Sequence, residues 1–180
     1  MHKESKEFLE SVKEKFPEYF EESRVLDIGS CDINGNNSYL FGGCDYLGLD
    51  LAPGPNVNIV CKTGDFRPDQ FFDVVISTNT FEHDKEWARS IRNIVLRILR
   101  KGGLFVFSCS GPGTLEHGTV NASPEASLSS AVWGDYYRNL TETDIRNVLN
   151  IEELFNPYNF HIKIRRKGMG TDLQFWGILL

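Results

Sequence analysis

The first stretch of the chain places apolar residues at a helical period among lysines and glutamates. These residues stand at i, i+1, i+4 and i+8: Phe8, Leu9, Val12 and Phe16. The spacing predicts a helix with one apolar stripe. Pro17 should end or bend this helix, because proline does not continue an α-helix. We therefore expect an N-terminal helix within residues 1–22.

From residue 24 the pattern changes to short apolar runs bounded by glycine, proline and asparagine, as is typical of strands. Val74, Val75 and Ile76 form an unbroken β-branched run, which is typical of a strand buried on both faces. The runs predict strands at residues 24–28, 46–50, 57–61, 72–77, 104–108, 161–165 and 173–180.

Helical patterns separate several of these strands. Apolar positions between residues 84 and 100 share one helical face, and Gly102 stands where a helix C-cap is expected. Thr141 and Asp144 have the spacing of a capping box for a helix over residues 141–150. This alternation predicts an α/β fold, namely a doubly wound, mostly parallel sheet with helices on both faces.

Composition narrows the class of protein. The 180 residues are enough for one domain, and 19 basic against 25 acidic residues give a net charge of −6. Nucleic acid is not an expected partner, because phosphate binding relies on clustered Lys and Arg. The four cysteines form no C-x-x-C pair, which favours reduced thiols over zinc. The chain has no signal-peptide pattern and no apolar run of about 20 residues, so we expect a cytoplasmic protein without a membrane partner.

The end of the first predicted strand carries the first chemical signal. Asp27 lies on the strand and Gly29 at its end, where glycine lets the backbone turn and approach a ligand. Cys31 occupies the second glycine position of a G-x-G-x-x-G motif, and no P-loop motif is present. These absences favour a nucleoside ligand, which carries no phosphates, over a dinucleotide.

Acidic residues after the next two strands suit such a nucleoside. Asp50 ends the second strand, 23 residues after Asp27, where an acid can accept hydrogen bonds from both ribose hydroxyls. Asp65 and Phe66 follow the third strand. The carboxylate suits the exocyclic amine of adenine, and the aromatic ring suits the face of the base.

Across residues 23–110 the chain resembles the class I S-adenosylmethionine-dependent methyltransferases, most closely the type 11 methyltransferase domain. Six motifs in the family's order carry the resemblance: VLDIGS (25–30), YLGLDL (46–51), GDF (64–66), FDVVIST (72–78), FEH (81–83) and LRKGGLFVFS (99–108). The resemblance implies a Rossmann-like sheet of seven strands with the last one antiparallel, and S-adenosylmethionine as cofactor. It implies these cofactor-binding residues: Asp27, Gly29, Ser30, Asp50, Leu51, Asp65, Phe66, Asn79 and Thr80.

Methyl transfer from a sulfonium is an in-line displacement, which depends mainly on positioning. A general base is needed only when the acceptor is protonated at neutral pH. Two Glu-His dipeptides are candidates, with His117 preferred as base and His83 second. A metal site from His83, Asp84, Glu116 and His117 is an alternative, but its spacing matches no standard ligand motif, so no metal is predicted.

Residues 111–139 carry no periodic pattern, which predicts a functional loop or lid. Glu116, Trp133, Tyr136 and Tyr137 are its candidate substrate-binding residues; alternatively, the three aromatic residues pack onto the core. We therefore expect a single methyltransferase domain in which residues 23–110 bind the cofactor and residues 111–180 form the substrate loop and closing elements.

The predicted function is methyl transfer to a small polar acceptor, such as a sugar or metabolite hydroxyl. One alternative is a non-catalytic S-adenosylmethionine-binding pseudoenzyme or partner subunit. Another is a nicotinamide-dependent oxidoreductase, against which the missing G-x-G-x-x-G motif argues. The oligomeric state stays open at this level.

Overall fold

The computed structural model describes residues 3–165 and 169–180. Residues 1–2 of the expected N-terminal segment and residues 166–168 of the expected C-terminal segment lie outside the described residues. The strands are β1 (Arg24–Ile28), β2 (Asp45–Asp50), β3 (Ile59–Val60), β4 (Phe72–Thr78), β5 (Leu99–Gly111), β6 (Phe155–Ile164) and β7 (Thr171–Leu179). The helices are α1 (Lys3–Lys15), η1 (Pro17–Phe20), η2 (Ser38–Leu40), α2 (Trp87–Asn93), η3 (Ile94–Ile98), η4 (Pro124–Ala126), α3 (Ser130–Trp133), α4 (Glu142–Val148) and α5 (Ile151–Leu154).

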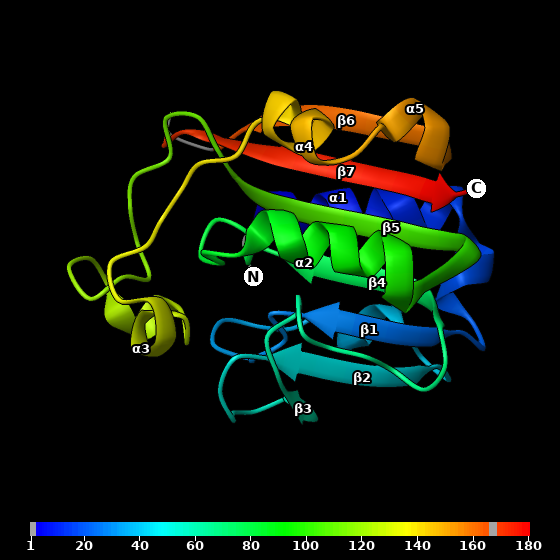
Figure 1. Cartoon of the computed structure of the whole chain (residues 1–180), viewed down its shortest axis with the longest axis horizontal. Helices are drawn as coiled ribbons and strands as arrows, with labels where there is room; N and C mark the ends of the chain where they lie inside the picture. Colours follow the sequence, from blue (N-terminus) through cyan, green and yellow to red (C-terminus); the bar gives the residue numbers. More distant parts are fainter. Residues whose placement is uncertain (1–2, 166–168) are drawn as a thin grey trace.

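All seven strands form one sheet in the order β3-β2-β1-β4-β5-β7-β6 (Figure 1). Strands β1 to β5 pair in parallel, whereas β7 is antiparallel to both of its neighbours. The expected seven-stranded, mostly parallel sheet with an antiparallel last strand is therefore confirmed. Because β1, β2 and β4 are parallel, their carboxyl ends and the loops that follow meet at the same edge of the sheet.

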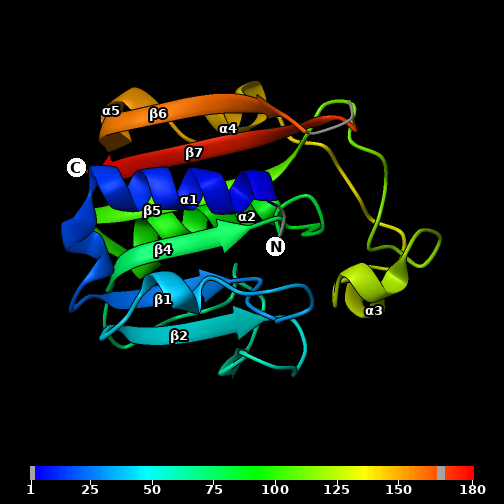
Figure 2. The same cartoon turned by 180° about the vertical axis from the view of Figure 1, so that it is seen from behind.

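Helices cover both faces of the sheet, as predicted. Helix α1 lies on one face, and α2 and α4 lie on the other (Figures 1 and 2). Side chains of β4 alternate between two cores: Val74 and Ile76 pack in the cluster that contains Leu9 of α1, and Val75 packs in the cluster that contains Ile91 of α2. This burial on both faces explains why the sequence of β4 is continuously apolar.

The helix expected over residues 84–100 is shorter in the structure. It begins at Trp87, passes into a π-helical turn at Ile94, and gives way to β5 at Leu99. Leu99 already pairs with Phe72, and the strand register shifts before Val74 pairs with Leu104. The expectation that Gly102 caps the helix is therefore wrong, because this glycine lies inside β5.

A Thr141/Asp144 capping box begins α4, as the sequence predicts. The Thr141 side chain accepts a hydrogen bond from the Asp144 N–H at 3.2 Å, and the Asp144 carboxylate accepts one from the Thr141 N–H at 2.9 Å. Such reciprocal bonds satisfy donors at the start of a helix.

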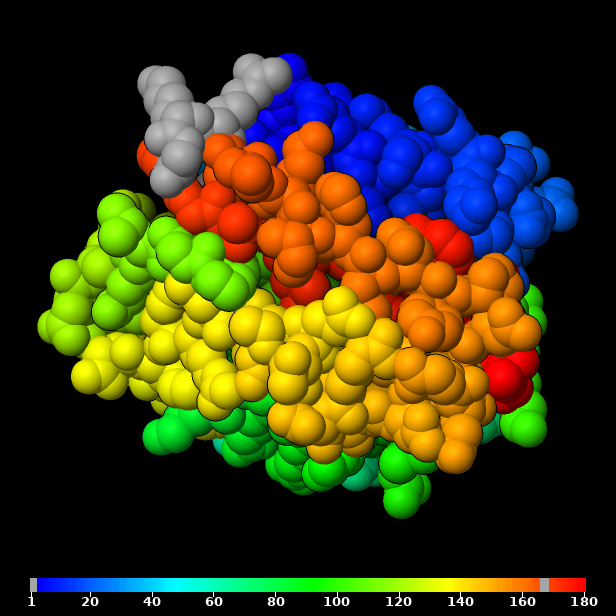
Figure 3. Space-filling view, turned by 90° about the horizontal axis from the view of Figure 1, so that it is seen from above, coloured from blue at the N-terminus to red at the C-terminus, as the bar shows by residue number. Residues whose placement is uncertain are grey.

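A long excursion covers most of residues 112–141 and contains only the short helices η4 and α3. In Figures 1 and 2 it extends beyond the edge of the sheet, with α3 at its far end. Seen from above, its green and yellow atoms form one end of the molecule, next to α4 and β6 (Figure 3). In the described ranges, no helix is both long and apolar enough to cross a membrane.

Candidate active site

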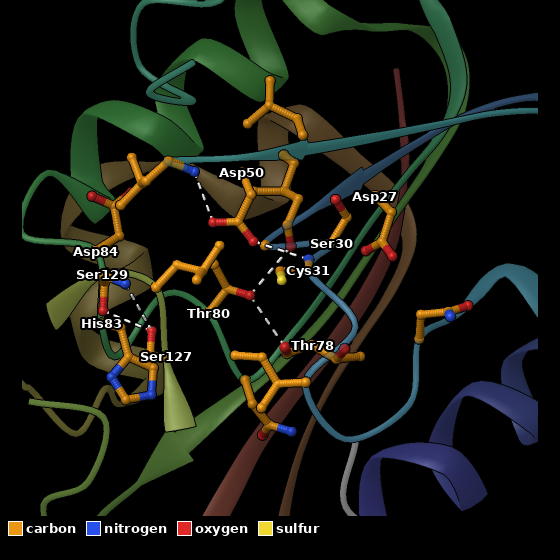
Figure 4. Close-up of a pocket in the computed structure, with 18 of the residues that line it drawn as sticks. Asp27, Ser30, Cys31, Asp50, Thr78, Thr80, His83, Asp84, Ser127 and Ser129 are labelled. Carbon is orange, nitrogen blue, oxygen red and sulfur yellow. Dashed lines mark hydrogen bonds between the residues drawn. The ribbon is translucent and has the colours of Figure 1, made fainter. Parts of the chain in front are cut away.

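A cavity of about 240 Å³ opens at the carboxyl ends of β1, β2 and β4 (Figure 4). The loops after these strands form one side of it, and residues 126–129 of the long excursion form another. Both predicted histidines and seven of the nine predicted cofactor residues line this cavity: Asp27, Gly29, Ser30, Asp50, Leu51, Asn79, Thr80, His83 and His117.

Asp50 presents a carboxylate at the end of β2. One oxygen accepts a hydrogen bond from the Cys31 N–H at 3.0 Å, and the other accepts one from the Leu51 N–H at 2.7 Å. Burial raises the pKa of Asp50, and these two N–H groups oppose the rise. Each carboxylate oxygen keeps a second lone pair that a ligand hydroxyl can use. Asp50 therefore fixes the loop after β1 and faces the cavity.

Gly29 allows the chain to turn at the end of β1. Its φ of +73° is unfavourable for other residues, and a Cβ at this position would overlap the side chain of Thr80. The Thr80 hydroxyl lies 3.2 Å from the Ile28 carbonyl oxygen, which holds it against the turn. Glycine is thus required here both by the backbone conformation and by the close approach of the loop after β4.

Asn79 connects the cavity to α1. Its own φ is +51°, and its N–H donates to the Ser108 carbonyl at 2.8 Å. Its side-chain amide donates to the Ser5 hydroxyl at 3.3 Å, and Ser108 also hydrogen-bonds Ser5. The N-terminal helix therefore packs against the loop that carries Asn79 and Thr80.

Asp27 is buried, and both of its oxygens have partners within the chain. The Tyr46 hydroxyl donates to one oxygen, and the Asn37 amide donates to the other at 3.0 Å. Burial raises the pKa of Asp27 to about 7, although both hydrogen bonds lower it. Its contacts bind the loop after β1 to β2, so a cofactor contact by Asp27 stays a prediction. Ser30 is also engaged locally, through the Asn56 carbonyl at 3.0 Å.

The structure does not bring Asp65 and Phe66 to the cavity. Asp65 forms an ion pair with Arg89 of α2, and Phe66 packs beside Phe72 in the core. Neither side chain lines the cavity. Two residues nearer the end of β3, Cys61 and Thr63, line the cavity instead. Contact of Asp65 and Phe66 with adenine therefore stays a prediction.

His83 and His117 line the other end of the cavity, and they meet Glu82 and Tyr137 in a group of four side chains that we call the histidine cluster. The two imidazole rings lie edge to face with centroids 5.0 Å apart, and the Tyr137 ring lies 5.4 Å from His83 and 5.1 Å from His117. One Glu82 oxygen accepts hydrogen bonds from the Ser110 N–H at 3.1 Å and the Ser110 hydroxyl at 2.8 Å. The loop after β4 and two separate parts of the long excursion thus meet in this cluster.

Burial determines the charge state of much of this cluster. It lowers the pKa of His83 to about 3, with smaller contributions from the nearby His117 and Arg165. Burial also raises the pKa of Glu82. His117 Nδ1 lies 3.0 Å from the Leu115 carbonyl oxygen, so a proton on Nδ1 leaves the lone pair on Nε2. Because the pKa of His83 lies well below 7, this residue is a neutral imidazole at neutral pH.

The four predicted substrate-binding residues lie in different environments. Tyr137 joins the histidine cluster, whereas Tyr136 packs against the core as the alternative interpretation expects. Glu116 is exposed and accepts a hydrogen bond from the Thr119 hydroxyl at 2.6 Å. The Trp133 ring lies under the Lys62 ammonium, 4.2 Å from it, and is not part of the cavity lining.

Sequence reasoning missed several residues of the site. Glu82 belongs to the first Glu-His dipeptide, but the sequence predicts no catalytic or binding role for it. Residues 126–129 carry no sequence pattern that indicates a cavity wall. Ser127 and Ser129 approach His83 in Figure 4, and their hydroxyls hydrogen-bond each other at 2.7 Å. No local motif signals such a contact, because it depends on how the long excursion folds back.

The strand order, the glycine turn after β1 and the cavity at the carboxyl ends are those of the class I methyltransferase fold. Residues 26–107, a little under half of the chain, match the model of the family described as "Methyltransferase domain". No curated protein matches the chain by sequence.

Solved structures with the same fold include methyltransferases of small molecules. The 1,6-didemethyltoxoflavin-N1-methyltransferase of Burkholderia thailandensis aligns with a TM-score of 0.62 at 14% identity, over 97% of this chain and 90% of its own. The N-methyltransferase NodS of Bradyrhizobium japonicum aligns with a TM-score of 0.64 at 14% identity, over 97% of this chain and 86% of its own. At these identities the likeness shows the fold alone.

Proposed function

We propose that this protein transfers the methyl group of S-adenosylmethionine to a small polar acceptor. The observation that carries the proposal is the two-ended cavity: the Asp50 carboxylate lies toward one end, and the histidine cluster lies at the other. A donor held at the first end would direct its methyl group toward an acceptor held at the second. Positioning of this kind supplies much of the acceleration in a displacement reaction.

The cofactor half is expected to use the ends of β1, β2 and β3. Asp50 accepts hydrogen bonds from the ribose hydroxyls, and Leu51, Cys61 and Thr63 contact the adenine. The methionine part lies along the loop after Gly29. This assignment keeps the sequence prediction for the ribose and replaces Asp65 and Phe66 with the residues that line the cavity.

The acceptor is expected at the histidine cluster. The nucleophilic atom of the acceptor attacks the methyl carbon of S-adenosylmethionine. The carbon–sulfur bond breaks, and its electron pair stays on sulfur, giving S-adenosylhomocysteine. His117 and His83 contact the acceptor and are the proposed catalytic residues, with His117 more accessible. Imidazole lone pairs suit an acceptor hydroxyl or amine that must lose a proton. The structure of the Burkholderia thailandensis N1-methyltransferase holds the small molecule 1,6-didemethyltoxoflavin together with S-adenosylhomocysteine, which supports a small acceptor.

The test is turnover of a panel of small hydroxyl and amine compounds, measured as S-adenosylhomocysteine release. We expect activity in the wild type, and a large loss in His117→Ala with unchanged affinity for S-adenosylhomocysteine. His161→Ala, an exposed histidine on β6, is the matched control. Full activity in His117→Ala would remove this residue from the mechanism. Cofactor binding without turnover on any acceptor would favour the non-catalytic alternative.

A further inference from the structure

Three side chains of the histidine cluster have the composition of a metal site. Glu82, His83 and His117 each bring one ligand atom to within 4.8 Å of the other two. Two imidazoles and one carboxylate form a donor set that binds Zn²⁺ and other divalent ions of the first transition row. The ligands come from the loop after β4 and from the long excursion, so the folded chain assembles them.

Two of these ligands have buried atoms with no partner. Glu82 Oε2 and His83 Nδ1 make no hydrogen bond to any of the residues that the structure describes. Glu82 is completely buried and His83 is 4% exposed. Buried polar atoms in folded proteins nearly always have a partner, and an unmatched one typically costs about 1–3 kcal/mol. A shared cation would satisfy both atoms at once.

The remaining polar atoms of Glu82 and His117 are held by neighbouring groups of the chain. The other Glu82 oxygen accepts two hydrogen bonds from Ser110. His117 Nδ1 lies against the Leu115 carbonyl oxygen at 3.0 Å, which directs the Nε2 lone pair away from that contact. Metal-bound histidines commonly donate their second ring N–H to a backbone carbonyl in this manner.

Gly118, directly after His117, lets the excursion approach the His83 ring. A Cβ on Gly118 would lie 2.7 Å from His83 Cε1 and 3.1 Å from Nδ1. Its φ of +66° is also a conformation that favours glycine. The edge of His83 that carries the unpartnered nitrogen therefore faces the segment that brings in His117.

We propose that Glu82, His83 and His117 bind one divalent first-row transition ion, with Zn²⁺ the best match. Magnesium and calcium fit poorly, because they prefer oxygen ligands in larger number. The role of the ion rests on the proposed function. With the imidazole lone pairs bound to it, the ion and not a free imidazole would activate the acceptor: it would bind the acceptor oxygen or nitrogen and lower its pKa, so that the proton leaves to solvent. The methyl carbon would then bond to the acceptor while the carbon–sulfur electron pair goes to sulfur. No electron is exchanged with the ion.

The test measures metal binding without any acceptor. The full chain is treated with chelator, dialysed and titrated with Zn²⁺ against a chromophoric chelator, and Co²⁺ is added separately to record its visible absorption bands. We expect one equivalent of Zn²⁺ in the wild type. Affinity should fall on the order of 100-fold in His83→Ala, His117→Ala and Glu82→Gln, and stay unchanged in His161→Ala. Circular dichroism confirms that each variant is folded.

Two outcomes would overturn the site: no Zn²⁺ binding by the wild type, or unchanged affinity in a folded His117→Ala. Turnover that persists undiminished in excess chelator, measured separately with an acceptor, would overturn the role of the ion. The last result would leave His117 as a direct proton acceptor. A thermal shift with S-adenosylhomocysteine is measured in parallel. Suppose that the wild type binds one equivalent of Zn²⁺, that the variants lose this binding, and that S-adenosylhomocysteine gives no thermal shift. This combination would support the metal site and contradict the methyltransferase function.

Discussion

The buried carboxyl group of Asp27 makes the stability of the protein depend on pH in a predictable direction. Asp27 is 1% exposed, and its pKa is raised from 3.8 to about 7 mainly by burial. Asp27→Asn keeps nearly the same shape but removes the titration. Asp69→Asn removes an exposed carboxylate and serves as the control for a change of charge.

The magnitude follows from the shift of about 3 pKa units. At about 1.4 kcal/mol per unit, the shift corresponds to about 4 kcal/mol. Between pH about 4 and about 7, the folded state holds a proton that the unfolded state has released. The free energy of unfolding contributed by Asp27 therefore falls as pH rises through this window and levels off above it. From pH 5 to pH 7 the expected loss is about 2 kcal/mol, because the dependence already levels off near the folded-state pKa.

Urea denaturation of the cofactor-free protein at pH 5, 6, 7 and 8 measures this effect. Other carboxyl groups also titrate, so the informative quantity is the difference in unfolding free energy between the wild type and Asp27→Asn. The unfolding free energy of the wild type minus that of Asp27→Asn should fall by about 2 kcal/mol from pH 5 to pH 7. The Asp69→Asn control shows what the loss of one exposed negative charge does by itself. A wild-type difference that is constant with pH, or that grows as pH rises, would refute the reasoning.

Two further substitutions have matched controls. Gly29→Ala should destabilise the protein by about 2–4 kcal/mol in urea titrations, because the new Cβ overlaps Thr80 and the backbone has a positive φ. The control is Gly43→Ala, where φ is +82° but a Cβ would have no atom within 4 Å. This variant should cost about 1 kcal/mol. Equal losses would contradict the predicted overlap. Asp50→Ala should weaken S-adenosylhomocysteine binding at least tenfold, about 1.4 kcal/mol in calorimetry, whereas Asp65→Ala should leave it unchanged. The reverse ranking would restore the sequence-based assignment of Asp65.

The fold was largely predictable because its main signals are local. The β-branched run at Val74, Val75 and Ile76 identifies a central strand, and Thr141 with Asp144 identifies a helix start. The boundary near residue 99 was not predictable from periodicity. Leu99 continues the apolar helical pattern, yet its pairing with Phe72 places it in β5. Strand pairing there outweighs the helical pattern.

The site was predictable where a residue directly follows a strand. Asp50 and Gly29 lie at strand ends, and the sheet topology alone brings them to the cavity. Asp65 lies farther along a turn, so its direction depends on tertiary contacts such as that with Arg89. The histidine cluster was predicted only in part, because the path of a 30-residue excursion leaves no periodic signal; Glu82 meets His117 only after that segment folds back.

The central claim is that the cavity binds the nucleoside of S-adenosylmethionine. Isothermal titration of the full chain with S-adenosylhomocysteine tests it most directly, because binding needs no knowledge of the acceptor. The account predicts one site with a dissociation constant in the micromolar range and a rise in melting temperature on binding. A well-folded sample that gives neither heat nor a thermal shift would contradict the claim.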